Sequence, residues 1–272
     1  MRKLRNRYSL MTSSLSTAVI TGRVPSATTD LENELKKTIA GEVRFDDVSK
    51  QIYSTDASLY QMEPVGVVIP RDAGDVQAVL EIAGKNGVSV LPRGGGTGLS
   101  GQTVNHAVVV DFSKYMHDVI EINKEEQWVR TQPGVTIDEL NRQLKPSGLF
   151  FTPDPSTSSR ANIGGAMGNN SCGTHSIIYG KTVDHVLEMD VTLSDGTQTN
   201  FGIRDSAALE GLLRKPGLEG DIYRGVTEIS ANAANLVESK FPKILRRVGG
   251  YNIDRTQGAS SLNLTPESYK HL

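Results

Sequence analysis

The residues of this sequence best suited to chemistry are glycines, because glycine exposes its backbone. Residues 92–102 read PRGGGTGLSGQ, so five of these eleven residues are glycine, and they directly follow an apolar run. Glycine adopts positive φ values and lets backbone N–H groups approach a ligand closely. Successive N–H groups in such a loop form a concave anion site. This segment, the first glycine loop, therefore predicts a site for the diphosphate of a nucleotide cofactor.

Two phosphate-binding motifs match the first glycine loop by spacing alone. Gly96, Gly98 and Gly101 fit the dinucleotide fingerprint of Rossmann folds, and the loop also fits a P-loop in which Gln102 replaces the lysine. Both motifs require a helix that begins in the loop. The apolar residues 108–112 predict the next strand and leave no room for that helix. We therefore predict neither Rossmann-type binding nor nucleotide hydrolysis here.

A second glycine-rich segment, residues 151–180, follows in the chain. It contains FTPDPST at 151–157, NIGGAMGNNSCG at 162–173, and then Tyr179 and Gly180. Polar, glycine-rich backbone between strands is costly to bury unless a partner satisfies it. We expect this second glycine region, like the first loop, to be a turn without a helix inside it. Together the two turns would grip one diphosphate through uncharged main-chain donors.

In this order and spacing, the two segments resemble the FAD-binding domain of the vanillyl-alcohol oxidase/p-cresol methylhydroxylase (PCMH-type) superfamily. Within it they are most similar to the branch that holds D-lactate dehydrogenase and the GlcD component of glycolate oxidase. The resemblance implies an α+β fold of two subdomains, with mixed sheets flanked by helices, and FAD as the cofactor. Residues 93–98 contain no histidine, so noncovalent FAD is implied.

The resemblance also assigns cofactor contacts to individual residues. In the first glycine loop these are Arg93, Gly94, Gly95, Gly96, Thr97, Gly98, Leu99, Ser100, Gly101 and Gln102. In and after the second region they are Pro153, Asp154, Gly164, Gly165, Asn170, Gly173, Tyr179, Gly180 and Val186. By resemblance, Tyr179 and Gly180 lie near the adenosine end. We expect Cys172 to be a buried loop residue, His175 to face solvent and Trp128 to pack in a core.

The reaction that the resemblance implies is oxidation of a small D-2-hydroxy acid, such as lactate or glycolate. The flavin accepts a hydride from the α-carbon while a base takes the hydroxyl proton. Electrons then pass to a cytochrome, a quinone or an iron–sulfur partner. In these relatives the base, the substrate-binding arginine and any metal belong to a C-terminal cap domain, which we expect to be truncated here. We therefore name no catalytic residue and no metal ligand.

Two alternatives stay open at this point. The chain can be an FAD-binding fragment, or one component of a complex, that catalyses nothing without a separate cap domain. It can also be a reductase of the cell-wall precursor type, which combines a similar FAD fold with NADPH. Residues 169–173 and 249–252 favour the hydroxy-acid branch by resemblance.

The elements around these segments follow from periodicity and capping signals. Leu31, Leu35 and Ile39 predict a helix that begins after Asp30 as its cap, and residues 65–69 and 88–91 predict parallel strands joined by a helix capped by Asp72. Further strands are expected at 108–112, 119–122 and 128–131, a helix from Thr136 to Gly148, and a hairpin at 186–193 and 197–201. We divide the chain into a leader or flexible N-terminus (1–30), the FAD-binding domain (31–232) and the start of the cap domain (233–272).

Composition restricts the remaining function classes. A net charge of −2 over 272 residues gives no general attraction to nucleic acid, and a single cysteine excludes an internal disulfide. No apolar run is long enough to span a membrane. We expect a cytoplasmic protein, with a peripheral position at the inner membrane as an option. The basic residues of the segment 1–30 leave a mitochondrial transit peptide as the alternative.

Overall fold

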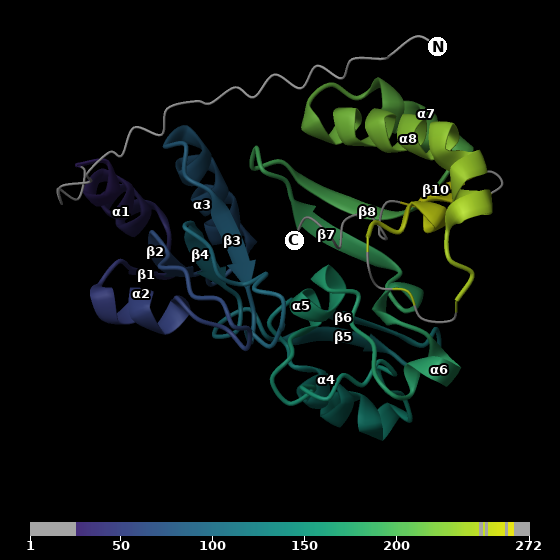
Figure 1. Ribbon diagram of the computed structural model, residues 1–272, viewed down its shortest axis with the longest axis horizontal. Coiled ribbons are helices and arrows are strands. Elements are labelled where there is room, and N and C mark those ends of the chain that lie inside the picture. Colours follow the sequence, from purple (N-terminus) through teal and green to yellow (C-terminus); the bar gives the residue numbers. More distant parts are fainter. Residues whose placement is uncertain (1–25, 245–246, 248–249, 259–260, 264–272) are drawn as a thin grey trace, which may run out of the picture.

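The computed structural model describes residues 26–244, 247, 250–258 and 261–263 (Figure 1). Three sheets organise this part of the chain, and helices lie against them in an α+β arrangement. Four strands form the first sheet, two form a ribbon in the middle of the chain, and four form a third sheet near the C-terminal side. No helix among the described residues has the length and apolar character needed to cross a membrane.

The first sheet has the strand order β1-β2-β4-β3. Its strands are β1 (Glu42–Arg44), β2 (Gly66–Ile69), β3 (Val90–Arg93) and β4 (Val108–Asp111). The predicted parallel direction of β2 and β3 is confirmed, but both pair with β4, which lies between them. β3 also begins two residues later than predicted. The carboxyl ends of β3 and β4 therefore lie side by side, and the first glycine loop leaves from the end of β3.

Helices cover the first sheet because each carries one apolar face. They are α1 (Ser26–Thr38), α2 (Asp47–Tyr53) and α3 (Ala73–Lys85). Leu31 and Leu35 of α1 and Val79 of α3 are fully buried against Val68 and Val108 of the sheet. This cluster is the largest group of buried apolar side chains under the N-terminal elements, and it fixes the strands from which the first glycine loop extends.

The predicted start of α1 was wrong. The helix begins at Ser26, so Asp30 lies inside it and is exposed instead of capping it. The sequence has Pro25 immediately before the helix, and proline favours a helix start, a signal that outweighed the capping preference of Asp30. By contrast, Asp72 caps α3 as predicted: its Oδ1 accepts a hydrogen bond from the Asp75 amide at 3.0 Å.

These two aspartates give a matched test of the helix assignments. Asp72→Ala should lower the free energy of unfolding by about 1 kcal/mol, because the cap hydrogen bond to α3 is lost. Asp30→Ala should leave that free energy unchanged or slightly higher, because alanine is the better residue inside a helix. Urea denaturation of both variants measures the difference; equal losses would contradict the assigned start of α1.

The middle of the chain forms a ribbon and a helix. β5 (Val119–Asn123) pairs antiparallel with β6 (Trp128–Thr131), and α4 (Ile137–Leu144) follows with the 3₁₀ turn η1 (Lys145–Ser147). Thr136 caps α4 by accepting a hydrogen bond from the Glu139 amide at 3.3 Å, and Gly148 ends the unit with φ 73°. The prediction for Trp128 was wrong: it is half-buried and donates to Glu126 at 2.7 Å, because its indole N–H finds a partner at the surface.

The second glycine region is not a simple turn, which corrects our expectation. It contains the short helices α5 (Ile163–Gly168) and α6 (Ser176–Tyr179) and the 3₁₀ turn η2 (Thr182–Asp184). Ile163 and Ala166 are three residues apart and both are buried in the cluster around α4, so a helical turn places them on one face. The backbone of this region is thus partly satisfied by its own turns.

The third sheet has the strand order β7-β8-β10-β9. Its strands are β7 (Glu188–Thr192), β8 (Gln198–Asp205), β9 (Gln257–Gly258) and β10 (Ser261–Asn263). The hairpin of β7 and β8 is confirmed, with Gly196 at φ 84° in its turn. The helices α7 (Ser206–Arg214) and α8 (Leu218–Lys240) cover this sheet (Figure 1). α8 continues through residue 232, at which we drew a domain boundary, and β9 and β10 lie beyond it.

Candidate cofactor-binding site

The first glycine loop connects two parallel strands without a helix. β3 ends at Arg93, β4 begins at Val108, and no residue between them is helical. A Rossmann fold or a P-loop would have a helix at this place. The predicted exclusion of both motifs is confirmed by this geometry.

The backbone of the first glycine loop has unused hydrogen-bonding capacity. None of the amides of residues 94–99 donates a hydrogen bond to any residue that the structure describes. Gly96 and Gly101 have φ values of 63° and 74°, a region that favours glycine. Further along, the Ser100 amide donates to the Gln102 side chain at 3.1 Å. Six consecutive N–H groups are thus free to bind an anion.

The two glycine regions pack directly against each other. A Cβ added to Gly95 would lie 2.2 Å from the Arg160 carbonyl oxygen, and one added to Gly94 would lie 2.6 Å from Oδ1 of Asn162. Gln102 completes this contact by donating to Oδ1 of Asn169 at 3.3 Å. Any side chain at residues 94 or 95 would separate the two regions. Glycine is required at these two positions by packing.

A cleft of about 530 Å³ opens where the two regions meet. Its lining residues come from five separate segments: Ala57, Gly95, Gly96, Thr97, Ser113, His117, Gly134, Val135, Thr136, Glu139, Arg160 and Asn162. Gly95, Gly96 and Thr97 belong to the row of free amides, so the anion-binding backbone forms part of the cleft wall. Within the described residues, no group of three or more His, Cys, Asp or Glu side chains is arranged to hold a metal ion.

Arg93 uses its guanidinium to hold the base of the loop. Nη1 donates to the carbonyl oxygens of Tyr53 and Thr103 at 3.0 and 3.1 Å, and Nη2 donates to that of Thr55 at 2.8 Å. Burial lowers the pKa of the Arg93 guanidinium. A Cβ on Gly96 would lie 2.9 Å from Arg93 Nη2. This side chain therefore joins α2, the following loop and the end of the first glycine loop.

The role of Arg93 can be tested through stability. Arg93→Gln should lower the free energy of unfolding by about 2 kcal/mol, because partly buried carbonyl oxygens lose a charged donor. Arg142→Gln is the matched control: this guanidinium is 71% exposed and pairs with Glu139, so its loss should cost less than about 1 kcal/mol. Urea denaturation without added cofactor measures both. An equal effect of the two changes would contradict the anchoring role of Arg93.

The glycines of the second region differ in what surrounds them. A Cβ on Gly164 would lie 2.8 Å from Cβ of Pro133, and one on Gly173 would lie 2.0 Å from the Asp154 carbonyl oxygen. Both positions are closed by protein. A Cβ on Gly165, in contrast, would meet no atom within 4 Å, and this residue is exposed. Packing does not explain glycine at position 165, which leaves room for a ligand there.

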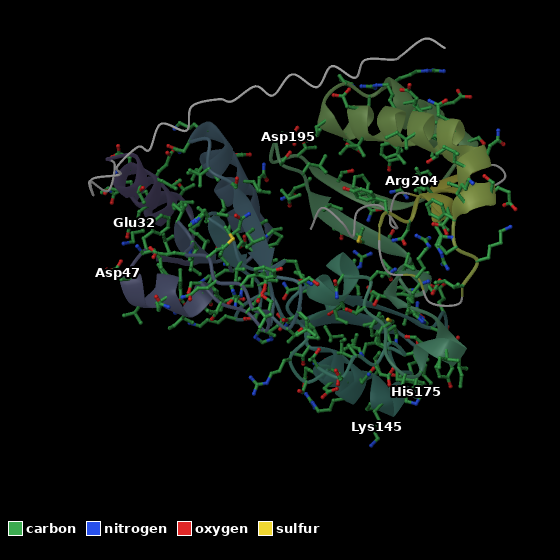
Figure 2. The ribbon with its side chains drawn as sticks, viewed as in Figure 1. Glu32, Asp47, Lys145, His175, Asp195 and Arg204 are labelled. Carbon is green, nitrogen blue, oxygen red and sulfur yellow. The ribbon has the colours of Figure 1, made fainter. Side chains whose placement is uncertain are left out.

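Asp154 connects the two ends of the second region. Its Oδ1 accepts from the His175 amide at 2.9 Å and its Oδ2 contacts His175 Nδ1 at 2.6 Å. Burial raises the pKa of the Asp154 carboxyl, but these bonds outweigh it, so the pKa is lowered overall. The predicted solvent exposure of His175 is confirmed, since its side chain is 61% exposed and lies beside α6 on the outer surface (Figure 2). Asp154 is preceded by Pro153, which is buried.

The prediction that Cys172 is buried was wrong. This residue is half-buried, and so are its neighbours Ser171 and Gly173. The loop that carries it runs toward the exposed His175, so the thiol lies near the surface and not in one of the apolar clusters.

Tyr179 and Gly180 lie at the far end of the second region. The Tyr179 ring packs edge-on against Phe150 at 5.8 Å between centroids, and its carbonyl oxygen contacts His185 Nε2 at 2.8 Å. Gly180 has φ 86° and faces Asp184. Val186 packs beside Val183 and Met189. None of these contacts reaches the first glycine loop, so Tyr179, Gly180 and Val186 are not brought together with residues 93–102.

Two buried asparagines border α5 and leave hydrogen bonds unmade. Asn162 donates to the Gly134 carbonyl oxygen while its Oδ1 has no partner, and Asn170 accepts from the Val183 amide at 3.1 Å while its Nδ2 has none. A buried polar atom without a partner costs about 1–3 kcal/mol. Such costs concentrate at functional sites. The free amides, the cleft and the open space at Gly165 fit a bound dinucleotide between the two regions.

Several residues of the cleft were not predicted from the sequence. Arg160, Gly134, Thr136 and His117 line it, although they carry no motif. Each comes from a different turn or helix end, and only the fold brings them to residues 95–97. Thr136 did give a signal, but as the cap of α4.

Comparisons with known proteins agree on the nature of this chain. A family model described as an FAD binding domain matches residues 64–202. The D-2-hydroxyglutarate dehydrogenase of Pseudomonas putida is 40% identical over 259 residues, which are 93% of this chain but 25% of that protein. Glycolate oxidase subunit GlcD of Bacillus subtilis is 35% identical over 173 residues, 62% of this chain and 37% of the relative.

A solved structure supports the same conclusion for the fold. Substrate-bound p-cresol methylhydroxylase matches with a TM-score of 0.59 at 18% identity, over 66% of this chain and 36% of that one. The predicted α+β fold of the PCMH type is confirmed by this likeness. The chain spans about a quarter of the length of the D-2-hydroxyglutarate dehydrogenase that it matches. From the matched segment, which includes both glycine regions, we conclude that the chain belongs to the FAD-binding domain family.

Proposed function

We propose that this chain binds FAD noncovalently, with the diphosphate on the amides of residues 94–99. The observation that carries this proposal is the row of six backbone N–H groups without protein acceptors, part of which lines a cleft between the two glycine regions. Gly165 gives the dinucleotide space beside the second region, and the Tyr179–Gly180 turn is the proposed adenosine end. Val186 and Asn170 support that turn from within the protein.

The activity that we propose for the whole protein is oxidation of a D-2-hydroxy acid. Its support is the 40% identity with a D-2-hydroxyglutarate dehydrogenase and the lower identity with a component of glycolate oxidase. We therefore place D-2-hydroxyglutarate before lactate and glycolate as the substrate. When bound, FAD supplies the hydride acceptor. The residues of this chain bind and orient the cofactor, and we assign none of them as the catalytic base.

Partners and location follow as part of the same proposal. A cytochrome, a quinone or an iron–sulfur protein takes the electrons, and the protein is cytoplasmic or peripheral to the inner membrane. We propose that the FAD-binding unit begins near residue 31, and that a cap domain supplies the substrate site. The alternative function is a piece that binds FAD but needs a separate cap domain for catalysis; the quarter-length match to the dehydrogenase favours keeping it.

Ligand-dependent stability tests the proposal. FAD at about 100 times its dissociation constant should stabilise the fold by about 2.7 kcal/mol, because it binds only the folded chain. Thermal melts in the presence of FAD, NAD or ATP measure this effect. A rise with FAD alone is the expected result. A rise with NAD alone would falsify flavin binding.

A further inference from the structure

We propose that the Arg160 guanidinium binds the cofactor diphosphate together with the free amides of the first glycine loop. This inference rests on the proposed function and adds to it a positively charged side chain. No sequence motif singles out Arg160, which lies between the two parts of the second region that carry the glycine motifs.

The position of Arg160 is fixed by its backbone. Its carbonyl oxygen lies against Gly95, close enough that a Cβ on that glycine would come within 2.2 Å. The next residues, Ala161 and Asn162, are buried, and the Arg160 amide donates to the Thr157 carbonyl oxygen at 2.8 Å. The residue is thus held beside the row of free amides, and it lines the same cleft as Gly96 and Thr97.

The guanidinium of Arg160 is available to a ligand. It makes no hydrogen bond or ion pair with any residue that the structure describes, and the residue is exposed. Most other arginines of the described chain, such as Arg93 and Arg142, donate to protein acceptors. An arginine can donate two parallel hydrogen bonds to a phosphate, which makes it well suited to this ligand.

The charges of the cleft favour an anion. Glu139 is the one carboxylate among the lining residues, and its oxygens accept from Arg142 Nε at 2.8 Å and Gln143 Nε2 at 2.7 Å. Its charge is therefore already paired on the outer side. Arg160 and His117 are the basic residues of the lining. An unpaired guanidinium next to six free N–H groups forms a site for a dianion such as a diphosphate.

Binding measurements on matched variants test this inference. Arg160→Gln should weaken FAD about tenfold and weaken ADP, measured by competition with FAD, by a similar factor, because both carry the diphosphate. It should also reduce the dependence of FAD affinity on salt between about 50 and 500 mM NaCl, as expected when one ionic contact is lost. Arg160→Lys keeps the charge and should keep most of the affinity and the salt dependence. Flavin fluorescence titration measures each value.

Lys145→Gln is the control, because it removes one positive charge from an exposed position that lies away from the cleft (Figure 2). It should leave the affinities for FAD and ADP unchanged. Unchanged FAD affinity in Arg160→Gln, or a loss for FAD without a loss for ADP, overturns the inference while FAD binding by the chain stands. Absence of FAD binding in the wild-type chain overturns the proposed function as well. A thermal melt confirms that each variant is folded.

Discussion

Gly95→Ala should weaken FAD binding by more than about a hundredfold, which is about 2.7 kcal/mol or more. The added Cβ would lie 2.2 Å from the Arg160 carbonyl oxygen and 3.4 Å from Asn162 Oδ1. Both atoms belong to the second glycine region, and a backbone carbonyl cannot rotate away as a side chain can. The first glycine loop must therefore move outward, and the cleft wall formed by residues 95–97 moves with it.

The control for this change is Gly84→Ala in α3, where a Cβ meets nothing within 4 Å. It should raise the free energy of unfolding by about 0.5–1 kcal/mol, because alanine favours a helix interior, and leave FAD binding intact. Fluorescence titration gives the affinities and urea denaturation the stabilities. Wild-type FAD affinity in Gly95→Ala would show that the cleft does not depend on contact between the two glycine regions.

Gly165→Leu should weaken FAD binding about thirtyfold while the chain without cofactor keeps its stability. The position is exposed and no protein atom would meet the added Cβ, so the folded chain has room for the side chain. Leucine is also a better helix former than glycine. A loss of affinity can then arise only because the ligand needs that space.

Gly211→Leu in α7 is the matched control, since this exposed helical glycine also has open space around its Cβ position. It should change neither FAD affinity nor the ability to retain flavin through gel filtration. Gly165→Leu should lose flavin in the same experiment. If both variants retain flavin equally, the dinucleotide does not pass beside α5.

The elements that the sequence predicted correctly are those with local signals. Asp72 and Gly87 mark the two ends of α3, and Gly196 marks the hairpin turn, because each of these residues acts within a few positions of itself. The absence of a helix after β3 could be predicted for the same reason, from the short distance to β4. The fold class followed from these elements and from the resemblance carried by the two glycine segments.

What the sequence did not predict depends on contacts between distant segments. The glycines at 94, 95, 164 and 173 share a motif with the glycine at 165, yet the first four are closed in by protein atoms and the last is open. β4 inserts between β2 and β3 although it follows both in the chain. Arg160 and Gly134 have no local pattern, and they become cleft residues only when the two glycine regions meet.

Hydrogen exchange of the amides of residues 94–99, with and without FAD, tests the central claim most directly. Those N–H groups have no acceptor in the described protein, so they should exchange rapidly in the free chain and slow by more than about tenfold at saturating FAD. The amides of β4, already bonded in the sheet, should change little. Rapid exchange of residues 94–99 in the fully flavin-loaded chain would mean that the diphosphate is bound somewhere else.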